Sequence, residues 1–327
     1  MSTAARKWQG PASSAAREWQ GPTFPAARKW QGPAFPAARK WQGPASSAAR
    51  KKERSLEMKK TAEKKVVEKK AVARRPAKAK DNLLLVREHK QVFKDGDSVL
   101  KVFDANYKVS AILNEAMNEA RAAETGLPVA KILEVCVIKG KWAIRREFIA
   151  GETLADVMAK DRKSLPKYLK EFAQIQCAVF AKTSPRMGNL ADKLDTMISA
   201  SPLDRNTRYD LHMRLQALPR GKSLCHGDFN PTNVIITPKG DWRVIDWSHV
   251  RLGDPLADVA RTYLLFWLSG HVKAAEQYVA LMCDALKARL PDVQKWLPIV
   301  AAAESSKPNT QKNLDLLLHW ASVVDYE

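Results

Sequence analysis

Cysteine is scarce in this sequence, and the four cysteines show no pairing pattern. Cys136, Cys177, Cys225 and Cys283 are scattered over 327 residues, and no two of them form a Cys-x-x-Cys pair. This spacing is typical neither of a structural zinc site nor of a disulfide framework, and it favours a reducing compartment.

Long apolar runs are also missing. The N-terminus lacks the apolar core of a signal peptide, and no run approaches the length of a membrane span. We therefore expect no transmembrane segment and a cytoplasmic location.

Acidic residues are scarce only at the start of the chain. The formal net charge is +20, but residues 1–80 hold 21 Lys and Arg against 5 Asp and Glu, whereas residues 81–327 hold 34 against 30. The basic character therefore belongs to an N-terminal tail. The remaining residues are nearly balanced in charge and numerous enough to bury a sizeable core.

The first fifty residues repeat one unit. Ala-Ala-Arg-(Lys/Glu)-Trp-Gln-Gly-Pro begins at residues 4, 15, 26 and 37, and a truncated copy begins at residue 48. Because each Gly-Pro prevents a continuous helix and the tryptophans are too sparse for a core, we expect residues 1–50 to be disordered. Residues 51–81, rich in paired lysines, are expected to form a basic linker.

Two interpretations of this tail remain open. The simpler one is a passive expanded repeat, which is the default because only its charge and its tryptophans suggest recognition. The other is weak binding to nucleic acid or to an anionic surface, since Trp stacks on bases while Arg and Lys meet phosphates.

The most informative pattern joins five residues near the middle of the C-terminal half. His226-Gly227-Asp228 is followed by Asn233, five positions after Asp228, and by Asp246, thirteen positions after Asn233. The catalytic loop of protein kinases has the order H-R-D-x-x-x-x-N, with a metal-binding Asp after a later strand.

The residues between Asn233 and Asp246 predict a β-hairpin. Residues 234–236 and 242–245 are apolar or β-branched runs, and a Thr-Pro-Lys-Gly-Asp turn separates them. Asn233 enters this hairpin and Asp246 leaves it, so both side chains are expected at the same end of two paired strands.

The residue types suit phosphoryl transfer. Mg²⁺ prefers oxygen ligands, so Asp246 and the side-chain oxygen of Asn233 are candidate metal ligands. A carboxylate that is not on the metal can orient a hydroxyl group and accept its proton, and Asp228 is the candidate catalytic residue. Any one of these residues alone would indicate a turn or a cap, but together at this spacing they predict a phosphotransfer site.

Residues 226–261 resemble the aminoglycoside phosphotransferase and choline kinase superfamily of small-molecule kinases. Gly253-Asp254-Pro255, with Asp258 following, looks like the "GDPxxD" continuation of that family. The resemblance covers about residues 83–327. It implies an α+β, protein-kinase-like bilobal fold, ATP or GTP with Mg²⁺ as cofactors, and transfer of phosphate to a hydroxyl group of a small-molecule acceptor.

Upstream residues supply candidates for binding the nucleotide. Lys101 lies in a predicted strand at 98–103. In kinases, the lysine that holds the α- and β-phosphates also lies in a strand. Residues 110–124 predict a helix that ends at Gly126. The resemblance implies that Glu115 in this helix pairs with Lys101, with Glu119, one turn later, as the alternative.

The resemblance also divides the chain into lobes. Residues 82–147 are expected to form an N-lobe of antiparallel strands with one helix, and residues 148–327 a mainly helical C-lobe with the catalytic loop and acceptor pocket. Residues 142–151 look like the last strand and the hinge. There the family pattern implies that the carbonyl of Glu147 and the N–H of Ile149 bind adenine.

One segment departs from the kinase pattern. The turn between the first two predicted strands, at 84–86 and 91–93, contains no glycine that would let backbone N–H groups approach a phosphate. Either Arg87 and Lys90 replace that contact with charge, or the nucleotide is poorly covered. The second case favours an alternative function, a kinase-fold binding protein with little or no turnover.

The predicted C-lobe helices lie at 154–158, 169–180, 193–197, 208–218, 259–267, 274–288, 293–303 and 314–324. Residues 259–327 hold seven acidic and seven basic side chains, and residues 151–220 hold eight against twelve. This balance argues against a polycationic aminoglycoside acceptor. Trp267, Trp296 and Trp320 are assigned to the core, with a sugar or quaternary-ammonium site as the alternative.

Overall fold

The computed structural model describes residues 82–87 and 89–323. The predictions for residues 1–50 and for the basic linker up to residue 81 lie outside this range. Within it, no helix is long and apolar enough to cross a membrane. All four cysteines are free thiols.

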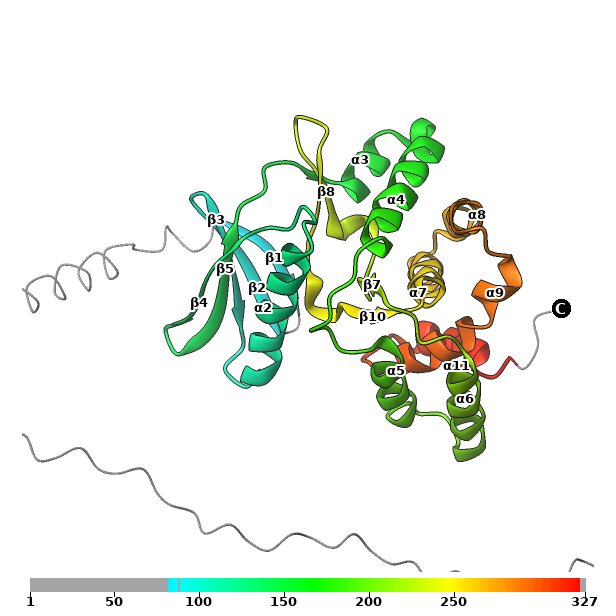
Figure 1. The fold of residues 1–327 in the computed structure, drawn as a ribbon. Coiled ribbons are helices and arrows are strands. Elements are labelled where there is room, and N and C mark those ends of the chain that lie inside the picture. The colour runs from blue at the N-terminus through cyan, green and yellow to red at the C-terminus, as the bar shows by residue number, and fades with distance from the viewer. Residues whose placement is uncertain (1–81, 88, 324–327) are drawn as a thin grey trace, which may run out of the picture. The chain divides into compact units, whose positions relative to one another are not determined.

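A five-stranded antiparallel sheet forms the N-lobe, in the order β1-β2-β3-β5-β4 (Figure 1). Gly96 and Gly140 have φ angles of 61° and 78°. They lie in tight hairpin turns, which need positive φ to match the right-handed twist of the strands. The strands are β1 (Leu83–Arg87), β2 (Lys90–Asp95), β3 (Ser98–Phe103), β4 (Ile132–Ile138) and β5 (Lys141–Glu147).

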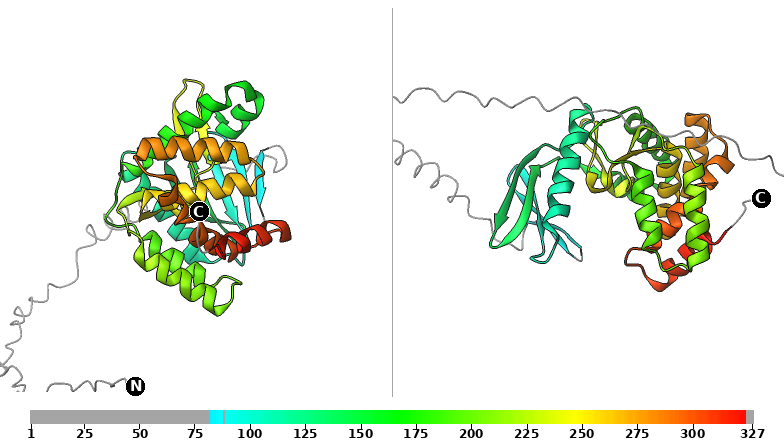
Figure 2. Two further views of the ribbon diagram at one scale, coloured as in Figure 1. Left: turned by 90° about the vertical axis from the view of Figure 1, so that its right-hand side faces the viewer. Right: turned by 60° about the horizontal axis from the view of Figure 1, so that its bottom comes forward.

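Helix α2 (Val109–Glu124) lies against one face of this sheet (Figure 2). Ile112 and Ala116, four residues apart on one helix face, pack against Phe103 of β3 and Ile144 of β5. The same face carries two buried acidic residues into the lobe, as described below. The helix ends before Gly126, whose φ of 80° is unfavourable for other residues.

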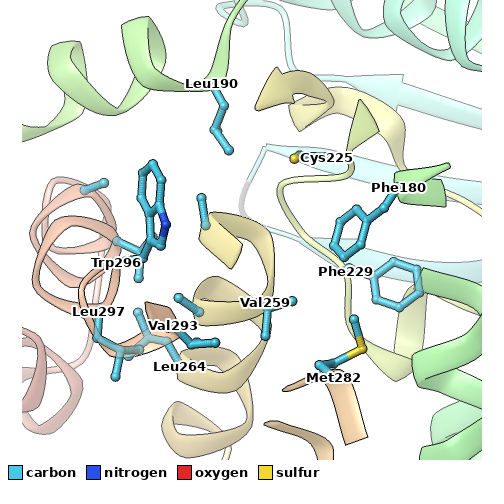
Figure 3. Packing of buried hydrophobic residues seen from close by; sticks show 14 of the residues in the cluster. Phe180, Leu190, Cys225, Phe229, Val259, Leu264, Met282, Val293, Trp296 and Leu297 are labelled. Atoms are coloured by element: carbon cyan, nitrogen blue, oxygen red, sulfur yellow. The ribbon is translucent and has the colours of Figure 1, made fainter. Parts of the chain in front are cut away.

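The C-lobe is mainly helical and contains the larger core. Figure 3 shows the helix that carries Val259 and Leu264 between Trp296 and Leu297 on one side and Phe229 and Met282 on the other. The helices are α3 (Leu154–Lys160), η1 (Arg162–Ser164), α4 (Leu165–Phe180), α5 (Leu190–Ser199), α6 (Arg205–Ala217), α7 (Pro255–Leu268), α8 (Val272–Leu286), α9 (Leu290–Gln294), α10 (Leu297–Ser305) and α11 (Gln311–Ala321).

Two small sheets carry the segment with the motif residues. β6 (Glu152–Thr153), β8 (Val234–Ile236) and β9 (Trp242–Val244) form one, and β7 (Ser223–Cys225) pairs with β10 (Arg251–Gly253) in the other. Val234 pairs with Val244, so the predicted hairpin is present. The short helices η2 (Pro231–Asn233) and η3 (Trp247–His249) flank it.

The predicted fold class is confirmed, but two element predictions were incomplete. Strand β4 was not predicted, because it is a half-exposed edge strand with Glu134 in its middle. The single helix expected at 293–303 is wrong: the segment forms α9 and α10, with Pro298 in the first turn of α10. Proline lacks an N–H and its ring collides with the preceding turn, so a continuous helix is broken there.

The assignment of the C-lobe tryptophans to the core holds for Trp296, which is 2% exposed. Trp267 and Trp320 are partly buried against the same core. Their ring centroids lie 5.3 Å apart in an edge-to-face arrangement. Packing in the core therefore accounts for all three side chains.

Candidate active site

The catalytic loop between β7 and η2 is anchored by Asp258 of α7. The backbone N–H groups of His226 and Gly227 donate to its two carboxylate oxygens, at 3.0 and 2.8 Å. Gly227 has a φ of 74°, and a Cβ at this position would lie 2.7 Å from the carbonyl oxygen of His249. Only glycine fits here, because any side chain would meet backbone.

His226 connects the two motif carboxylates. Its Nδ1 accepts the backbone N–H of Asp228 at 3.3 Å, so the ring proton lies on Nε2, which donates to the carbonyl of Ile245 at 3.1 Å. The ring is fully buried and packs edge-on against Trp247, with 4.8 Å between the two ring centroids. One imidazole therefore ties the loop that carries Asp228 to the residue that precedes Asp246.

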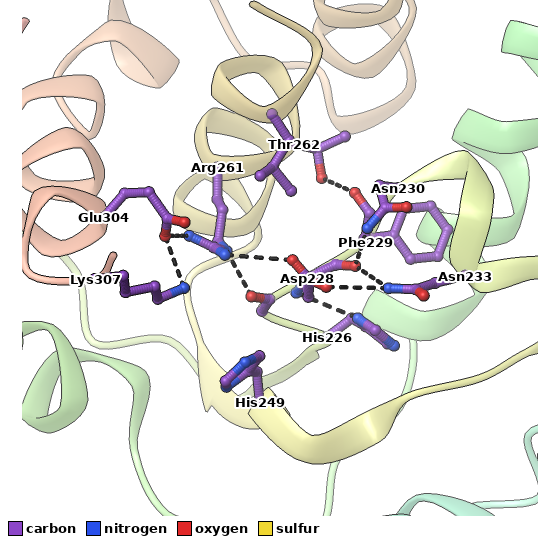
Figure 4. Close-up of polar contacts among 12 residues, drawn as sticks. His226, Asp228, Phe229, Asn230, Asn233, His249, Arg261, Thr262, Glu304 and Lys307 are labelled. Atoms are coloured by element: carbon purple, nitrogen blue, oxygen red, sulfur yellow. Dashed lines mark hydrogen bonds and ion pairs between the residues drawn. The ribbon is translucent and has the colours of Figure 1, made fainter. Parts of the chain in front are cut away.

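The Asp228 carboxylate is held from two sides, as Figure 4 shows. Oδ2 accepts from Asn233 Nδ2 at 3.1 Å, and Oδ1 lies 3.3 Å from the Arg261 guanidinium. The side chain is 21% exposed, so it remains accessible. Because both neighbours donate to it, the carboxylate is held in one orientation, as a proton acceptor requires.

Asn233 and Asp246 fit the donor set of a magnesium site. Asn233 Nδ2 also donates to the carbonyl of Asp228 at 2.8 Å, which turns the amide oxygen away from the loop (Figure 4). Asp246 follows β9 with φ 61° and ψ 60°, a left-handed conformation that costs about 1 kcal/mol or more for a residue with a side chain. Such backbone strain is typical of functional sites.

Two side-chain oxygens are too few to hold a metal ion alone. In the described part of the chain, no group of three or more His, Cys, Asp or Glu residues is arranged around a possible metal position. Mg²⁺ is commonly bound by one or two protein oxygens together with substrate phosphates and water. The residues present therefore fit Mg²⁺ shared with a nucleotide.

Lys101 lies between the two lobes. Its Nζ is 2.7 Å from Glu115 Oε1 and 3.3 Å from Asp246 Oδ1, and its side chain is 8% exposed. Burial alone would raise the pKa of Asp246, but Lys101 and Lys90 hold that pKa well below its usual range. The ion pair with Glu115 that the sequence predicted is present.

Arg146, which the sequence analysis missed, completes this buried network. Its guanidinium donates to Glu115 Oε1 at 2.7 Å and to Glu119 Oε2 at 2.6 Å. Glu119, the alternative partner for Lys101, is therefore used by Arg146 instead. Burial raises the pKa of Glu119 even though Arg146 opposes that effect. The sequence signal was the Arg145-Arg146 pair in the strand predicted before the hinge.

Lys90 of β2 adds a second cation at the glycine-free turn. Its Nζ lies 3.7 Å from Glu115 Oε2 and 5.5 Å from the centre of the Tyr107 ring. This position supports the interpretation that charge replaces a glycine-rich turn here. The side chain of Arg87, the other cation proposed for this role, lies outside the described residues.

A cleft of about 620 Å³ joins these groups. Leu84, Leu85, Val92 and Val99 form its apolar roof, and Ile235 and Ile245 lie opposite. Lys101, Glu147, Ile149, Asn233 and Asp246 also line it, so five of the seven predicted site residues are brought together. Glu115 lies behind Lys101, and Asp228 lies beyond Asn233.

Arg261 of α7 organises the other side of Asp228. It donates to the Gly227 carbonyl and pairs with Glu304, which in turn lies 2.7 Å from Lys307 Nζ (Figure 4). Burial would raise the pKa of Glu304, but Arg261 and Lys307 lower it to about 2. These three residues were not predicted from the sequence, because Arg261 meets Gly227, Asp228 and Glu304 only through contacts that span more than thirty positions.

Comparisons with known proteins identify a family. The model of the phosphotransferase enzyme family matches residues 87–296. No match was found among curated proteins.

Solved structures with the same fold include kinases of two kinds. A ternary complex of a thermostable mutant of aminoglycoside phosphotransferase APH(4)-Ia with AMP-PNP and hygromycin B is 19% identical, with a TM-score of 0.53 over 73% of this chain and 93% of that one. Choline kinase LicA from Streptococcus pneumoniae is 17% identical, with a TM-score of 0.53 over 80% of this chain and 100% of that one. Aminoglycoside-3'-phosphotransferase of type VIII is 16% identical, with a TM-score of 0.54 over 69% of this chain and 93% of that one.

Proposed function

The chain belongs to the phosphotransferase enzyme family, and on this basis we propose that it transfers the terminal phosphate of ATP or GTP to a hydroxyl group of a small molecule. The observation that carries the proposal is the position of Lys101. Its ammonium group contacts both Glu115 and Asp246 at the edge of a cleft of about 620 Å³. A kinase uses this arrangement to hold phosphates beside a metal ligand.

Each group in the cleft has a separate role in this proposal. Lys101 and Lys90 bind the phosphates, and Glu115 keeps Lys101 in position. The backbone at Glu147 and Ile149 binds the base. Asp246 and Asn233 would hold Mg²⁺, which when bound neutralises charge on the phosphate oxygens.

The transfer step requires little covalent help from the protein. The acceptor hydroxyl oxygen attacks the terminal phosphorus, the bond from that phosphorus to the bridging oxygen breaks, and the nucleoside diphosphate leaves. The hydroxyl proton passes to the Asp228 carboxylate, which Arg261 and Asn233 hold in position. Orientation and electrostatic stabilisation supply most of the rate in such reactions.

A second candidate function is a binding protein of the same fold with little turnover. The glycine-free turn between β1 and β2 favours it, because fewer backbone N–H groups can approach the phosphates. The presence of Lys101, Asp228, Asn233 and Asp246 at one site favours catalysis instead.

A nucleotide-consumption screen distinguishes the two functions. The purified protein is incubated with ATP or GTP and Mg²⁺, and with hydroxyl-bearing metabolites and antibiotics. An active kinase consumes nucleotide with at least one acceptor, and both chelation of Mg²⁺ and the Asp228→Asn variant abolish that consumption. Tight Mg²⁺-nucleotide binding without consumption by any acceptor would support the binding protein.

A further inference from the structure

Three elements bring cations to the side of Asp228 that faces away from Asn233. Lys193 of α5, Arg261 of α7 and Lys307, just after α10, line one small cavity together with Gly227 of the catalytic loop. Arg261 contacts Asp228 directly at 3.3 Å. The cavity therefore adjoins the residue proposed to accept the proton of the acceptor.

The carboxylates around this cavity already have partners. Asp258 receives two backbone N–H groups, at 3.0 and 2.8 Å, and the Gln176 amide at 3.3 Å. Glu304 is shared between Arg261 and Lys307. The contacts of both carboxylates go to groups other than Lys193, so neither forms an ion pair with it.

Lys193 is the cation without a balancing charge. Its Nζ lies 3.2 Å from Nδ1 of His249 and donates to the His249 carbonyl at 3.4 Å. Burial and the nearby cations hold the pKa of His249 well below its usual value, so this ring is neutral. Among the described residues, no carboxylate lies within ion-pairing distance of Lys193.

This arrangement is costly unless an anion binds. Burial and the charges of Arg261 and Lys307 lower the pKa of Lys193 to about 7. A half-buried cation without a paired counter-ion is unfavourable, and an apolar side chain would pack here at less cost. The remaining lining includes Leu190, Leu194, Met197 and Val300, which would suit such a residue.

The size of the cavity limits what enters it. Its volume is about 20 Å³. A water molecule needs roughly 10–15 Å³ measured in this way, so the cavity admits one or two oxygen atoms of a larger group, the rest of which stays outside, and does not admit a sugar ring. Lys307 is 29% exposed, so the cations can be reached from solvent. An oxygen-bearing end group fits these limits.

We propose that the acceptor carries an anionic end group, a carboxylate or a phosphate, that Lys193, Arg261 and Lys307 bind beside Asp228. The inference rests on the proposed function, because it names the substrate class of that same site. A cationic acceptor would place its charge against three cations, an arrangement that disfavours binding.

Anion binding is tested first without turnover, with inorganic sulfate as the probe. Thermal midpoints of the full chain are measured in sodium sulfate and in sodium chloride at equal ionic strength. Sulfate stabilises proteins in general. The matched control is therefore Lys273→Met, which makes the same substitution at an exposed lysine of α8.

We expect sulfate to raise the thermal midpoint of the wild type above its value in chloride. Lys193→Met should lose part of this increase, and Lys273→Met should keep all of it. Methionine fills nearly the same volume without charge, so the variant is expected to fold. If sulfate raises the thermal midpoint of Lys193→Met as much as that of the wild type, the proposed anion site is wrong.

The acceptor class is then tested with matched compounds: glycerate, glycerol 3-phosphate, glycerol and aminopropanediol. We expect turnover to be fastest with an anionic member, and Lys193→Met to reduce its kcat/KM about tenfold or more, mainly through KM. Faster turnover of the neutral or amine member would overturn the inference and leave the proposed function intact. If Mg²⁺-nucleotide is neither bound nor consumed, the proposed function fails instead, and the sulfate comparison still decides whether the anion site exists.

Discussion

At the scale of single residues, the two motif carboxylates differ in the groups that hold them. Asp228 is oriented by Asn233 and Arg261, whereas Asp246 contacts Lys101 in the cleft between the lobes. These two environments suit the roles proposed for them, a proton acceptor and a metal ligand. Substitution of each should therefore produce a different kinetic defect.

The first prediction separates the two roles. Asp228→Asn should lower turnover about 100-fold or more and leave Mg²⁺-nucleotide binding largely intact, because it removes only the proton acceptor. Asp246→Asn should also weaken nucleotide binding, about tenfold or more, because a charged ligand of the metal is lost. Titration calorimetry with a non-hydrolysable nucleotide gives the binding constants. An equal binding defect in both variants would contradict the assignment.

The second prediction concerns pH and follows from Lys193. Its pKa is lowered to about 7, so the side chain is charged below this pH and neutral above it. A charged lysine binds an anionic acceptor better, so KM for that acceptor should rise as the pH is raised from about 6 to 8. The charged and titratable groups around Lys193 and its cavity are Asp228, His249, Arg251, Asp258, Arg261, Glu304 and Lys307.

The control for this pH effect is Lys193→Met. In that variant the rise in KM should be absent across the same pH range, although the KM itself is higher throughout. Persistence of the same rise would assign the titration to another group.

At the scale of elements, helix α2 is held to the sheet by buried charge as well as by apolar packing. Arg146 of β5 reaches both Glu115 and Glu119 of the helix, and Asn118 donates to the carbonyl of Ser248 in η3 at 3.3 Å. The helix therefore couples the position of Lys101 to the segment that follows Asp246.

The third prediction tests this attachment. Arg146→Met leaves Glu119, which is 1% exposed, without its partner, and the loss of one member of a buried ion pair costs about 3 kcal/mol. For a folded region of this size, the thermal midpoint should fall by about 10 °C. The control is Arg145→Met on the same strand, whose partner carboxylates are 30% and 52% exposed. The thermal midpoint of Arg145→Met should fall much less. An equal fall in the two variants would contradict the role given to the buried network.

The elements themselves were predicted to different extents. The hairpin that carries Asn233 and Asp246 was predictable because its strands and its turn are adjacent in sequence. The partners of Arg146 and Arg261 could not be predicted in this way. Glu119 and Glu304 lie far from them along the chain, and the folding of each lobe brings them together. Local patterns therefore located the motif residues, and tertiary contacts decided which cations surround them.

At the scale of the whole molecule, charge and chemistry belong to different parts of the chain. Residues 1–80 hold 21 basic against 5 acidic side chains, and all the proposed site residues lie after them. The tail and the phosphotransfer site are therefore expected to be separable.

The fourth prediction is that the tail is dispensable for catalysis. A chain that starts at Met58 or Asp81 should keep its thermal midpoint and its rate of nucleotide consumption. It should lose most affinity for nucleic acid, and that affinity in the full chain should fall steeply with salt through counter-ion release. Turnover and nucleic-acid retention are measured on both chains. A large loss of turnover in the shorter chain would mean that the tail regulates the enzyme.

The apolar roof of the nucleotide cleft has a thermodynamic consequence. Leu84 and Leu85 are 52% and 45% exposed, although they line a cleft suited to a planar base. Covering them removes apolar surface from water, which gives a negative change in heat capacity. The binding enthalpy of a nucleotide should therefore become more favourable as the temperature rises, whereas Leu84→Ser should flatten that slope. Calorimetry at several temperatures measures it, and equal slopes in the two proteins would mean that the base binds away from this roof.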